Sequence, residues 1–153
     1  MIKRILLHNI RSAHNVGSVF RTADGAGVQR IYLSGYTPRP IDRFGRIQPE
    51  IEKTSLGASA TVSFEDWGED PITNLHTLKS DGWEIVSVEQ DARSVSFYDY
   101  TPCDRTLYIF GNEIDGVTKD LLDLSDRVIE IPMMGQKESL NVSVAAGVLL
   151  FHR

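Results

Sequence analysis

Three short segments hold most of the residues that could bind a ligand or stabilise a charge. They are HNIRSAHNVGSVFRTADGAG (8–27), FGNEIDGV (110–117) and IPMMGQKESLNVSVAAGVLLF (131–151). In the first segment, the guanidinium of Arg21 can bind an anion, but it is an awkward base because it does not normally lose its proton in proteins. The other two segments offer carboxylate, hydroxyl and amide groups, so the chain presents candidate polar groups at three separate places.

The second segment is a turn bracketed by Gly111 and Gly116, directly after an apolar strand expected at 106–110. In sheets of parallel strands, ligands bind where strands end, so this turn is a candidate binding element. It matches neither GxGxxG nor a phosphate loop with GK[ST], and an ordinary dinucleotide or ATP site is therefore unsupported. Its alternative interpretation is a plain surface turn, because turns favour Gly, Asn and Asp in any case.

The third segment joins a strand ending at 131–133 to a helix expected to begin at Ser139, which is a plausible N-cap. Main-chain amides at such a helix start are free to bind a ligand. The small and apolar residues that follow, 144–148 and Phe151, are explained by close packing alone.

The sequence gives little support for a metal site or for a catalytic cysteine. The four histidines, His8, His14, His76 and His152, have no spacing typical of metal ligands, so no metal is expected. Cys103 is the only cysteine, which excludes an intrachain disulfide, and we interpret it as an interior residue rather than a nucleophile.

The elements that position these segments follow from hydrophobic periodicity. Residues 2–8 form the first expected strand, followed by a helix from an N-cap at Ser12 through Ala23 and a second strand at 29–33. One side of the helix is apolar (Val16, Val19, Phe20, Ala23), and Asn15, Ser18, Arg21 and Thr22 are expected on the opposite side, with Gly25 and Gly27 ending the helix. Arg21 is therefore predicted to point away from the core.

The rest of the chain alternates between strands and helices. A loop is expected at 36–49, helices at 50–60, 71–80, 118–124 and 139–152, and strands at 61–64, 83–88, 106–110 and 127–131. This alternation predicts an α/β fold, a parallel sheet covered by helices on both faces. The 153 residues, 41% hydrophobic and without repeats or linkers, favour a single domain over 1–153.

Charge is unevenly distributed. The net charge is -5, which argues against nucleic acid, yet residues 1–48 hold eight Lys or Arg against two acids (+6), whereas residues 49–153 hold eight against nineteen (-11). The first third can form a basic surface, unless these are scattered solvated side chains. The apolar runs are too short for a membrane span and the N-terminus lacks a secretory signal, so a cytoplasmic location is expected.

Taken in order from Leu7 to Phe151, the three segments resemble the three motifs of the SpoU/TrmH family, the RNA ribose methyltransferases of the SPOUT superfamily. The resemblance implies an enzyme that transfers a methyl group from S-adenosylmethionine to a ribose 2′-hydroxyl of RNA. It also implies a trefoil knot in the C-terminal half and a homodimer whose interface includes the last helix.

The resemblance assigns roles by position. The residues that match the family's active site are Arg21, Asn15, Glu113, Ser139 and Asn141, and those that match its cofactor site are Val88, Gly111, Ile131, Ser139 and Leu140. Arg21 is expected to stabilise the developing 2′-oxyanion and to help remove its proton through an RNA phosphate. Asn15, Glu113 and Asn141 are expected to orient Arg21 and the ribose.

RNA binding is expected to use Arg11, Arg21, Arg39, Arg43 and Arg46. The chain is similar to the minimal single-domain members of the family, which modify the wobble ribose of tRNA anticodons, so tRNA is the expected substrate and rRNA the alternative. Two further alternatives stay open: methylation of a base by the same fold, and a non-catalytic RNA-binding protein that retains it.

Overall fold

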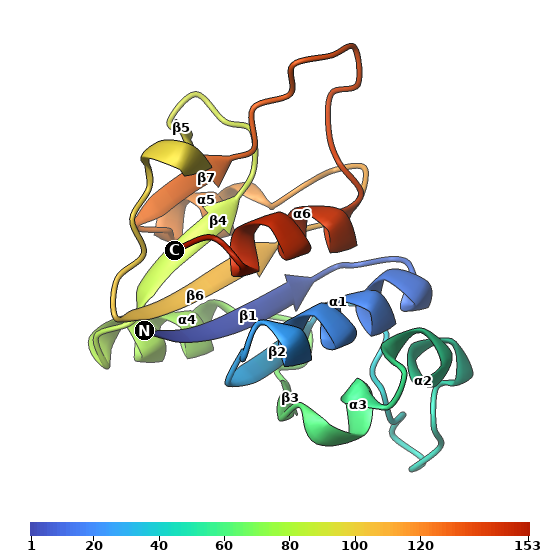
Figure 1. Cartoon of the computed structure of the whole chain (residues 1–153). Coiled ribbons are helices and arrows are strands. Elements are labelled where there is room, and N and C mark those ends of the chain that lie inside the picture. The colour runs from blue at the N-terminus through green and yellow to red at the C-terminus, as the bar shows by residue number, and fades with distance from the viewer.

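The computed structural model describes all residues, 1–153, as one seven-stranded sheet flanked by helices (Figure 1). The strands are β1 (Ile2–His8), β2 (Arg30–Ser34), β3 (Phe64–Asp66), β4 (Glu84–Val88), β5 (Val95–Ser96), β6 (Arg105–Phe110) and β7 (Arg127–Glu130). The helices are α1 (Ala13–Gly25), α2 (Pro49–Ser55), α3 (Ala58–Thr61), α4 (Ile72–Ser80), the short 3-10 helix η1 (Phe97–Asp99), α5 (Lys119–Leu124) and α6 (Val142–Leu150). None of these helices has the length and apolar character needed to cross a bilayer.

The sheet order is β3-β2-β1-β6-β4-β7-β5, and every neighbouring pair is parallel. Strand β1 lies inside the sheet because it pairs with β2 on one side and β6 on the other, with Leu6 opposite both Tyr32 and Ile109. The predicted α/β fold is thus confirmed, and the trefoil knot stays a prediction.

Alternation along β1 divides the core into two layers. Ile5 and Leu7 face one side of the sheet, where α1 and α6 pack, and Leu6 faces the other, where α4 and α5 pack. All three side chains are fully buried, as expected for a parallel sheet with helices on both faces. Figure 1 shows α1 and α6 side by side on one face.

Helix α1 follows its sequence pattern closely. The Ser12 hydroxyl accepts a hydrogen bond from the Asn15 amide (3.1 Å), which is the predicted N-cap. The helix extends two residues beyond Ala23, and Gly27 with φ +68° then reverses the chain. The predicted polar side was wrong for Asn15, which is buried because α6 begins against it.

The predicted helix at 50–60 was wrong as a single element. Leu56 and Gly57 both have positive φ (+49° and +91°), which no helix can continue through, so α2 and α3 are separate. Strand β3 consequently starts at Phe64 rather than at 61.

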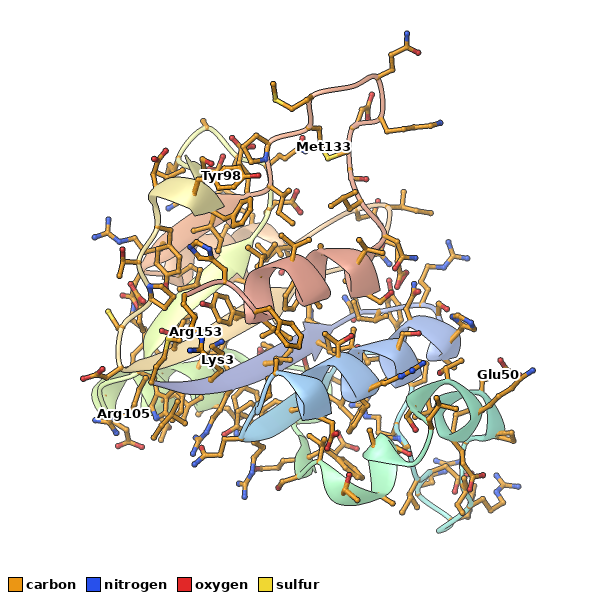
Figure 2. All side chains as sticks on the ribbon, in the orientation of Figure 1. Lys3, Glu50, Tyr98, Arg105, Met133 and Arg153 are labelled. Carbon is orange, nitrogen blue, oxygen red and sulfur yellow. The ribbon has the colours of Figure 1, made fainter.

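The last helix starts later than predicted. It begins at Val142, and its cap is Asn141, whose side-chain oxygen accepts from the Ser143 amide (2.9 Å); Ser139 lies in the preceding loop and is exposed. Residues 131–141 therefore form a long loop that rises from the sheet at Met133 (Figure 2). Cys103, expected inside, is exposed.

Candidate functional site

The carboxyl ends of β4, β6 and β7 enclose a cavity of about 270 Å³. Its walls come from the three segments that follow those strands, and it contains every residue predicted to bind a cofactor: Val88, Gly111, Ile131, Ser139 and Leu140. The structure thus brings these five residues together around one hollow, although β4 and the Ser139 loop are about fifty residues apart in sequence. A cavity at the carboxyl edge of parallel strands is the usual ligand site of such sheets.

The wall formed by residues 111–116 can be built only with glycine at both ends. A Cβ on Gly111 would lie 2.4 Å from the Gly116 carbonyl carbon, and one on Gly116 would lie 1.9 Å from a carboxylate oxygen of Glu89. The turn is closed by hydrogen bonds from the Asn112 amide to the Gly116 carbonyl (3.1 Å) and from the Gly116 amide back to Asn112 (2.9 Å). Backbone can therefore approach a ligand closely here.

The charged residues that line the cavity are all acidic. They are Glu89, Glu113, Asp115, Glu130 and Glu138, and no lysine or arginine is among the lining residues. Apolar side chains such as Val88, Phe110 and Leu140 form the remaining surface. This lining favours a ligand that combines an apolar ring with positive charge, and it disfavours a phosphate-bearing dinucleotide.

Glu113 ties the cavity to the start of α1. Both of its carboxylate oxygens accept from the Arg11 amide, each at 3.0 Å. Next to it, the Asn112 side chain donates to the Asn9 carbonyl (3.0 Å) and to the Tyr36 hydroxyl (2.9 Å). These contacts fix the loops after β1, β2 and β6 relative to one another.

Asn15 and Asn141 meet at the junction of α1 and α6. The Asn141 side chain donates through Nδ2 to Asn15 Oδ1 (3.2 Å), while its own oxygen accepts from the Ser143 amide and hydroxyl (2.9 and 2.6 Å). Because Val142, the next residue, lines the cavity, this pair lies at the cavity's rim.

Arg21 lies apart from the cavity in the single chain. It is exposed on α1 as predicted, and it lines a second hollow with Asp24 and residues of the link between α2 and α3. It follows Asn15 by six residues, about 9 Å along the helix and roughly a third of a turn around it. Of the five residues predicted to be catalytic, Glu113 and Ser139 line the cavity, Asn15 and Asn141 flank it, and Arg21 does not reach it.

The five arginines predicted to bind RNA differ in their environments. Arg39 is engaged inside the chain, donating to the Gly35 carbonyl (2.7 Å) and to Asp66 (2.8 Å), and its side chain is only 17% exposed. These contacts hold the pKa of the Asp66 carboxyl below its usual value. Arg11, Arg21, Arg43 and Arg46 are exposed and remain candidates; of these, Arg46 also pairs with Asp42 (2.8 Å).

Several residues of the site were missed by sequence reasoning. Glu89 accepts from the Val117 amide (2.9 Å) and braces the glycine turn, Gln90 donates to the Glu138 carbonyl across the cavity, and Asn112 joins the loops. Their positions could have identified them, because Glu89 and Gln90 directly follow the end of β4 and Asn112 lies two residues after the end of β6. No cluster of His, Cys, Asp or Glu in the chain is arranged to hold a metal ion.

The sequence profile of the SpoU rRNA Methylase family matches residues 3–151. The chain belongs to this family. The predicted resemblance is confirmed, and the match covers all three segments that build the cavity and its rim.

Two similar proteins are named for different kinds of RNA. The chain is 36% identical over 149 residues to the tRNA (guanosine(18)-2′-O)-methyltransferase of Thermus thermophilus, covering 96% of this chain and 71% of that protein. It is 31% identical over 150 residues to the 23S rRNA (guanosine-2′-O-)-methyltransferase RlmB of Neisseria meningitidis, covering 95% and 55%. The chain thus spans between about half and seven tenths of the length of these relatives.

Solved structures share the fold. The Aquifex aeolicus TrmH/SpoU tRNA modifying enzyme superposes with a TM-score of 0.84 at 29% identity, covering 98% of this chain and 72% of that one. An S-adenosylmethionine-bound rRNA methyltransferase from Sinorhizobium meliloti gives a TM-score of 0.88 at 24% identity, covering 99% and 55%, which supports the fold alone.

Proposed function

We propose that this protein is an S-adenosylmethionine-dependent RNA methyltransferase that modifies a ribose 2′-hydroxyl, with tRNA as substrate. The observation that carries the proposal is the cavity at the carboxyl edge of the sheet, where Val88, Gly111, Ile131, Ser139 and Leu140 converge. The relatives named for tRNA and rRNA 2′-O-methylation support it, and a cytoplasmic location is part of the proposal.

The residues present fit the methyl donor. S-adenosylmethionine carries a sulfonium and an ammonium against a single carboxylate, so its net charge is positive, and it also has an adenine ring; the cavity offers five carboxylates together with an apolar surface. When bound, the donor supplies an activated methyl group, and the protein supplies position and electrostatics. The backbone at Gly111 and in the Ser139 loop would hold it, because neither position places a bulky side chain in the way.

The chain's own groups would act on the acceptor ribose. Arg21 would bind the 2′-oxygen and the adjoining phosphate, lowering the energy of the developing oxyanion and holding the phosphate that takes up the proton. Glu113, held by the Arg11 amide, and the Asn15–Asn141 pair would fix the ribose. Alignment of the two reacting atoms is worth roughly 7 to 11 kcal/mol of the barrier.

A homodimer would complete the site. Exposed apolar residues follow one stripe of α6 and its ends, namely Leu140, Val144, Val148 and Phe151. Such a stripe is typical of a subunit interface. Arg21 does not line the cavity of its own chain. We therefore propose that each cavity takes the Arg21 side chain of the second copy.

The deciding experiment incubates total RNA with labelled S-adenosylmethionine and maps the product at nucleotide resolution. Label in a 2′-O-methylnucleoside from tRNA is the expected result, and label in rRNA would identify the alternative substrate. Label in a methylated base would place the protein in a different reaction class, and no transfer to any RNA would favour a non-catalytic RNA-binding protein.

A further inference from the structure

The loop between β2 and α2 carries a tight hairpin at residues 40–48. Ile41 and Ile47 form an antiparallel bridge, and the Gln48 amide donates to the Pro40 carbonyl (2.9 Å). The Asp42 carboxylate closes the tip by accepting from the Phe44 amide (2.8 Å), and it accepts from the Arg46 amide as well (3.0 Å). The Arg46 amide is the main reason that the pKa of the Asp42 carboxyl lies below its usual value.

The tip of this hairpin displays an aromatic ring that contacts two guanidiniums. Phe44 is 66% exposed, and the guanidinium carbons of Arg43 and Arg46 lie 4.7 and 4.9 Å from its ring centroid. No aromatic side chain of the chain stacks on Phe44, whereas Tyr32 stacks on Trp67 and Phe20 packs against Phe64. Phe44 thus combines a largely exposed aromatic side chain with two guanidiniums in cation–π contact.

Both ends of the loop are anchored to the body of the protein. At the β2 end, Arg39 donates to Gly35 and Asp66, as described above. At the other end, the Thr54 hydroxyl of α2 donates to the His14 carbonyl of α1 (3.1 Å), and a Cβ on Gly17 would lie 2.8 Å from the Ile51 carbonyl oxygen. The ring is thus presented on a supported hairpin, which reduces the entropy lost on binding.

The hairpin and the cavity belong to the same edge of the sheet. All strands are parallel, so the loops after β2 and β6 leave from the same edge, and β2 is two strands from β6, about 10 Å in a sheet. Figure 1 shows this loop beside α2, on the side to which β1 and β6 point. The net charges differ between the two places. The charged lining of the cavity is entirely acidic, whereas the hairpin tip carries two arginines and one carboxylate, Asp42, which accepts from Arg46 Nε (2.8 Å).

We propose that the hairpin tip is a stacking platform for an unpaired nucleobase of the RNA substrate. Phe44 stacks on the base, and Arg43 and Arg46 pair with the flanking phosphates. The proposal rests on the proposed function, since it specifies which part of the RNA is gripped: a single-stranded segment, because base faces inside a duplex are already covered. Aromatic stacking of this kind tolerates any base, so the platform adds affinity without reading sequence.

The test measures binding without methyl donor, using a fluorescein-labelled single-stranded adenosine 12-mer and an abasic ribose-phosphate oligomer of equal length. Phe44→Ala should weaken binding of the 12-mer by roughly 5- to 150-fold, the loss typical of one stacked base, and should leave binding of the abasic oligomer unchanged. Phe44→Trp should retain affinity and show quenched tryptophan fluorescence on binding. The double variant Arg43→Gln/Arg46→Gln should weaken binding of both oligomers and reduce the salt dependence of that binding.

Tyr98→Ala is the matched control. Tyr98 is 73% exposed, and Figure 2 places it on the opposite side of the molecule from Glu50, which lies next to the hairpin. The proposal is overturned if wild type does not bind the 12-mer, or if Phe44→Ala binds it as tightly as Tyr98→Ala does. A change of oligomeric state in Phe44→Ala with unchanged RNA affinity would instead identify the tip as a protein contact and would also overturn it.

The methyl-transfer assay on total RNA is run separately, so the two proposals can fail independently. Loss of 12-mer binding in Phe44→Ala without any methyl transfer by wild type would support the stacking platform and contradict the enzymatic function. Methyl transfer by wild type with unchanged 12-mer binding by Phe44→Ala would contradict the stacking platform and support the enzymatic function.

Discussion

At the scale of single residues, Arg21 stands out because it is exposed and lies outside the cavity that would hold the methyl donor. We expect Arg21→Ala to lower single-turnover transfer by a factor of roughly 10² to 10³ (about 2.7 to 4 kcal/mol), the usual cost of losing a donor aimed at a developing oxyanion. Donor affinity should stay close to that of wild type. Arg21→Lys should restore little, because an ammonium does not reproduce the planar fork.

Arg105→Ala serves as the control for this change. Arg105 begins β6 at the edge of the sheet away from the cavity (Figure 2), so its loss should leave transfer unchanged. If Arg21→Ala kept most of its rate at saturating RNA, Arg21 would be at most an RNA contact.

His8 gives a pH dependence to stability. It is buried at the end of β1 with Nδ1 2.7 Å from the Ser34 hydroxyl, and burial lowers its pKa below 6.5, while Asp120, Asp70 and Glu69 act in the opposite direction. The unfolded chain therefore takes up a proton near pH 6.5 that the native protein resists. The contribution of His8 to the free energy of unfolding is therefore fully present above pH 6.5, and it is lost as the pH falls below that value.

Calorimetric unfolding at pH 7.5 and 5.5 checks this expectation. His8→Gln should flatten the change in unfolding temperature between the two pH values, whereas His76→Gln, at an exposed position of α4, should leave it as in wild type. An identical pH profile for wild type and His8→Gln would show that other groups cause the change.

At the scale of elements, Asn141 serves both as the cap of α6 and as the partner of Asn15. Asn141→Ala should lower the free energy of unfolding by about 0.5 to 2 kcal/mol, the usual cost of a lost N-cap. Asn141→Asp should keep most of the stability, since Asp caps as well as Asn, but a carboxylate cannot donate to Asn15. Denaturant unfolding together with the transfer rate separates the two roles, and full transfer by Asn141→Asp would remove the positioning role.

The elements that sequence predicted well are those with strong local patterns. The apolar residues of β1 and β6 and the one-sided pattern of α1 are set by periodicity, and each appears close to its predicted bounds. The break between α2 and α3 was missed because Leu56 is an ordinary helix former, and its residue type gives no sign of the positive φ that it adopts. The two residues of β5 are too few to carry a period.

The site was predictable as a set of segments but not in its contacts. Ser139 and Asn141 are both good caps, and only Asn141 has a hydrogen-bond partner on α1, Asn15, which is 126 positions away in sequence. The sequence did not distinguish Arg39 from the other arginines of the first third, yet its guanidinium donates to Gly35 and Asp66. Partners far apart in sequence, such as Arg39 and Asp66, cannot be identified from a local pattern.

At the scale of the whole molecule, the apolar stripe on α6 predicts a homodimer. Light scattering at micromolar protein should give the dimer mass, and Val144→Glu should shift it toward the monomer by placing a charge in the stripe. A monomer alone in wild type would contradict the prediction.

If the dimer shares its sites, inactive variants should complement one another. An equal mixture of Arg21→Ala and Gly111→Val chains, exchanged under mild denaturant, should recover about a quarter of the wild-type activity, because half of the dimers are mixed and each has one intact site. Activity at the level of the separate variants would place Arg21 and the cavity of one chain in a single site.

The pairing of β1 with β6 also affects the rate at which the protein folds. This strand is joined to β6, about one hundred positions along the chain, and Lys3 donates to the carbonyl of Leu150 in α6. Closing such a long loop costs chain entropy before the contacts that stabilise it have formed. Chains rich in such pairings therefore fold slowly, in roughly milliseconds to seconds. The cavity and the Asn15–Asn141 contact depend on the same closures, and binding competence should therefore appear together with the native sheet in a refolding experiment, with no earlier partly active species.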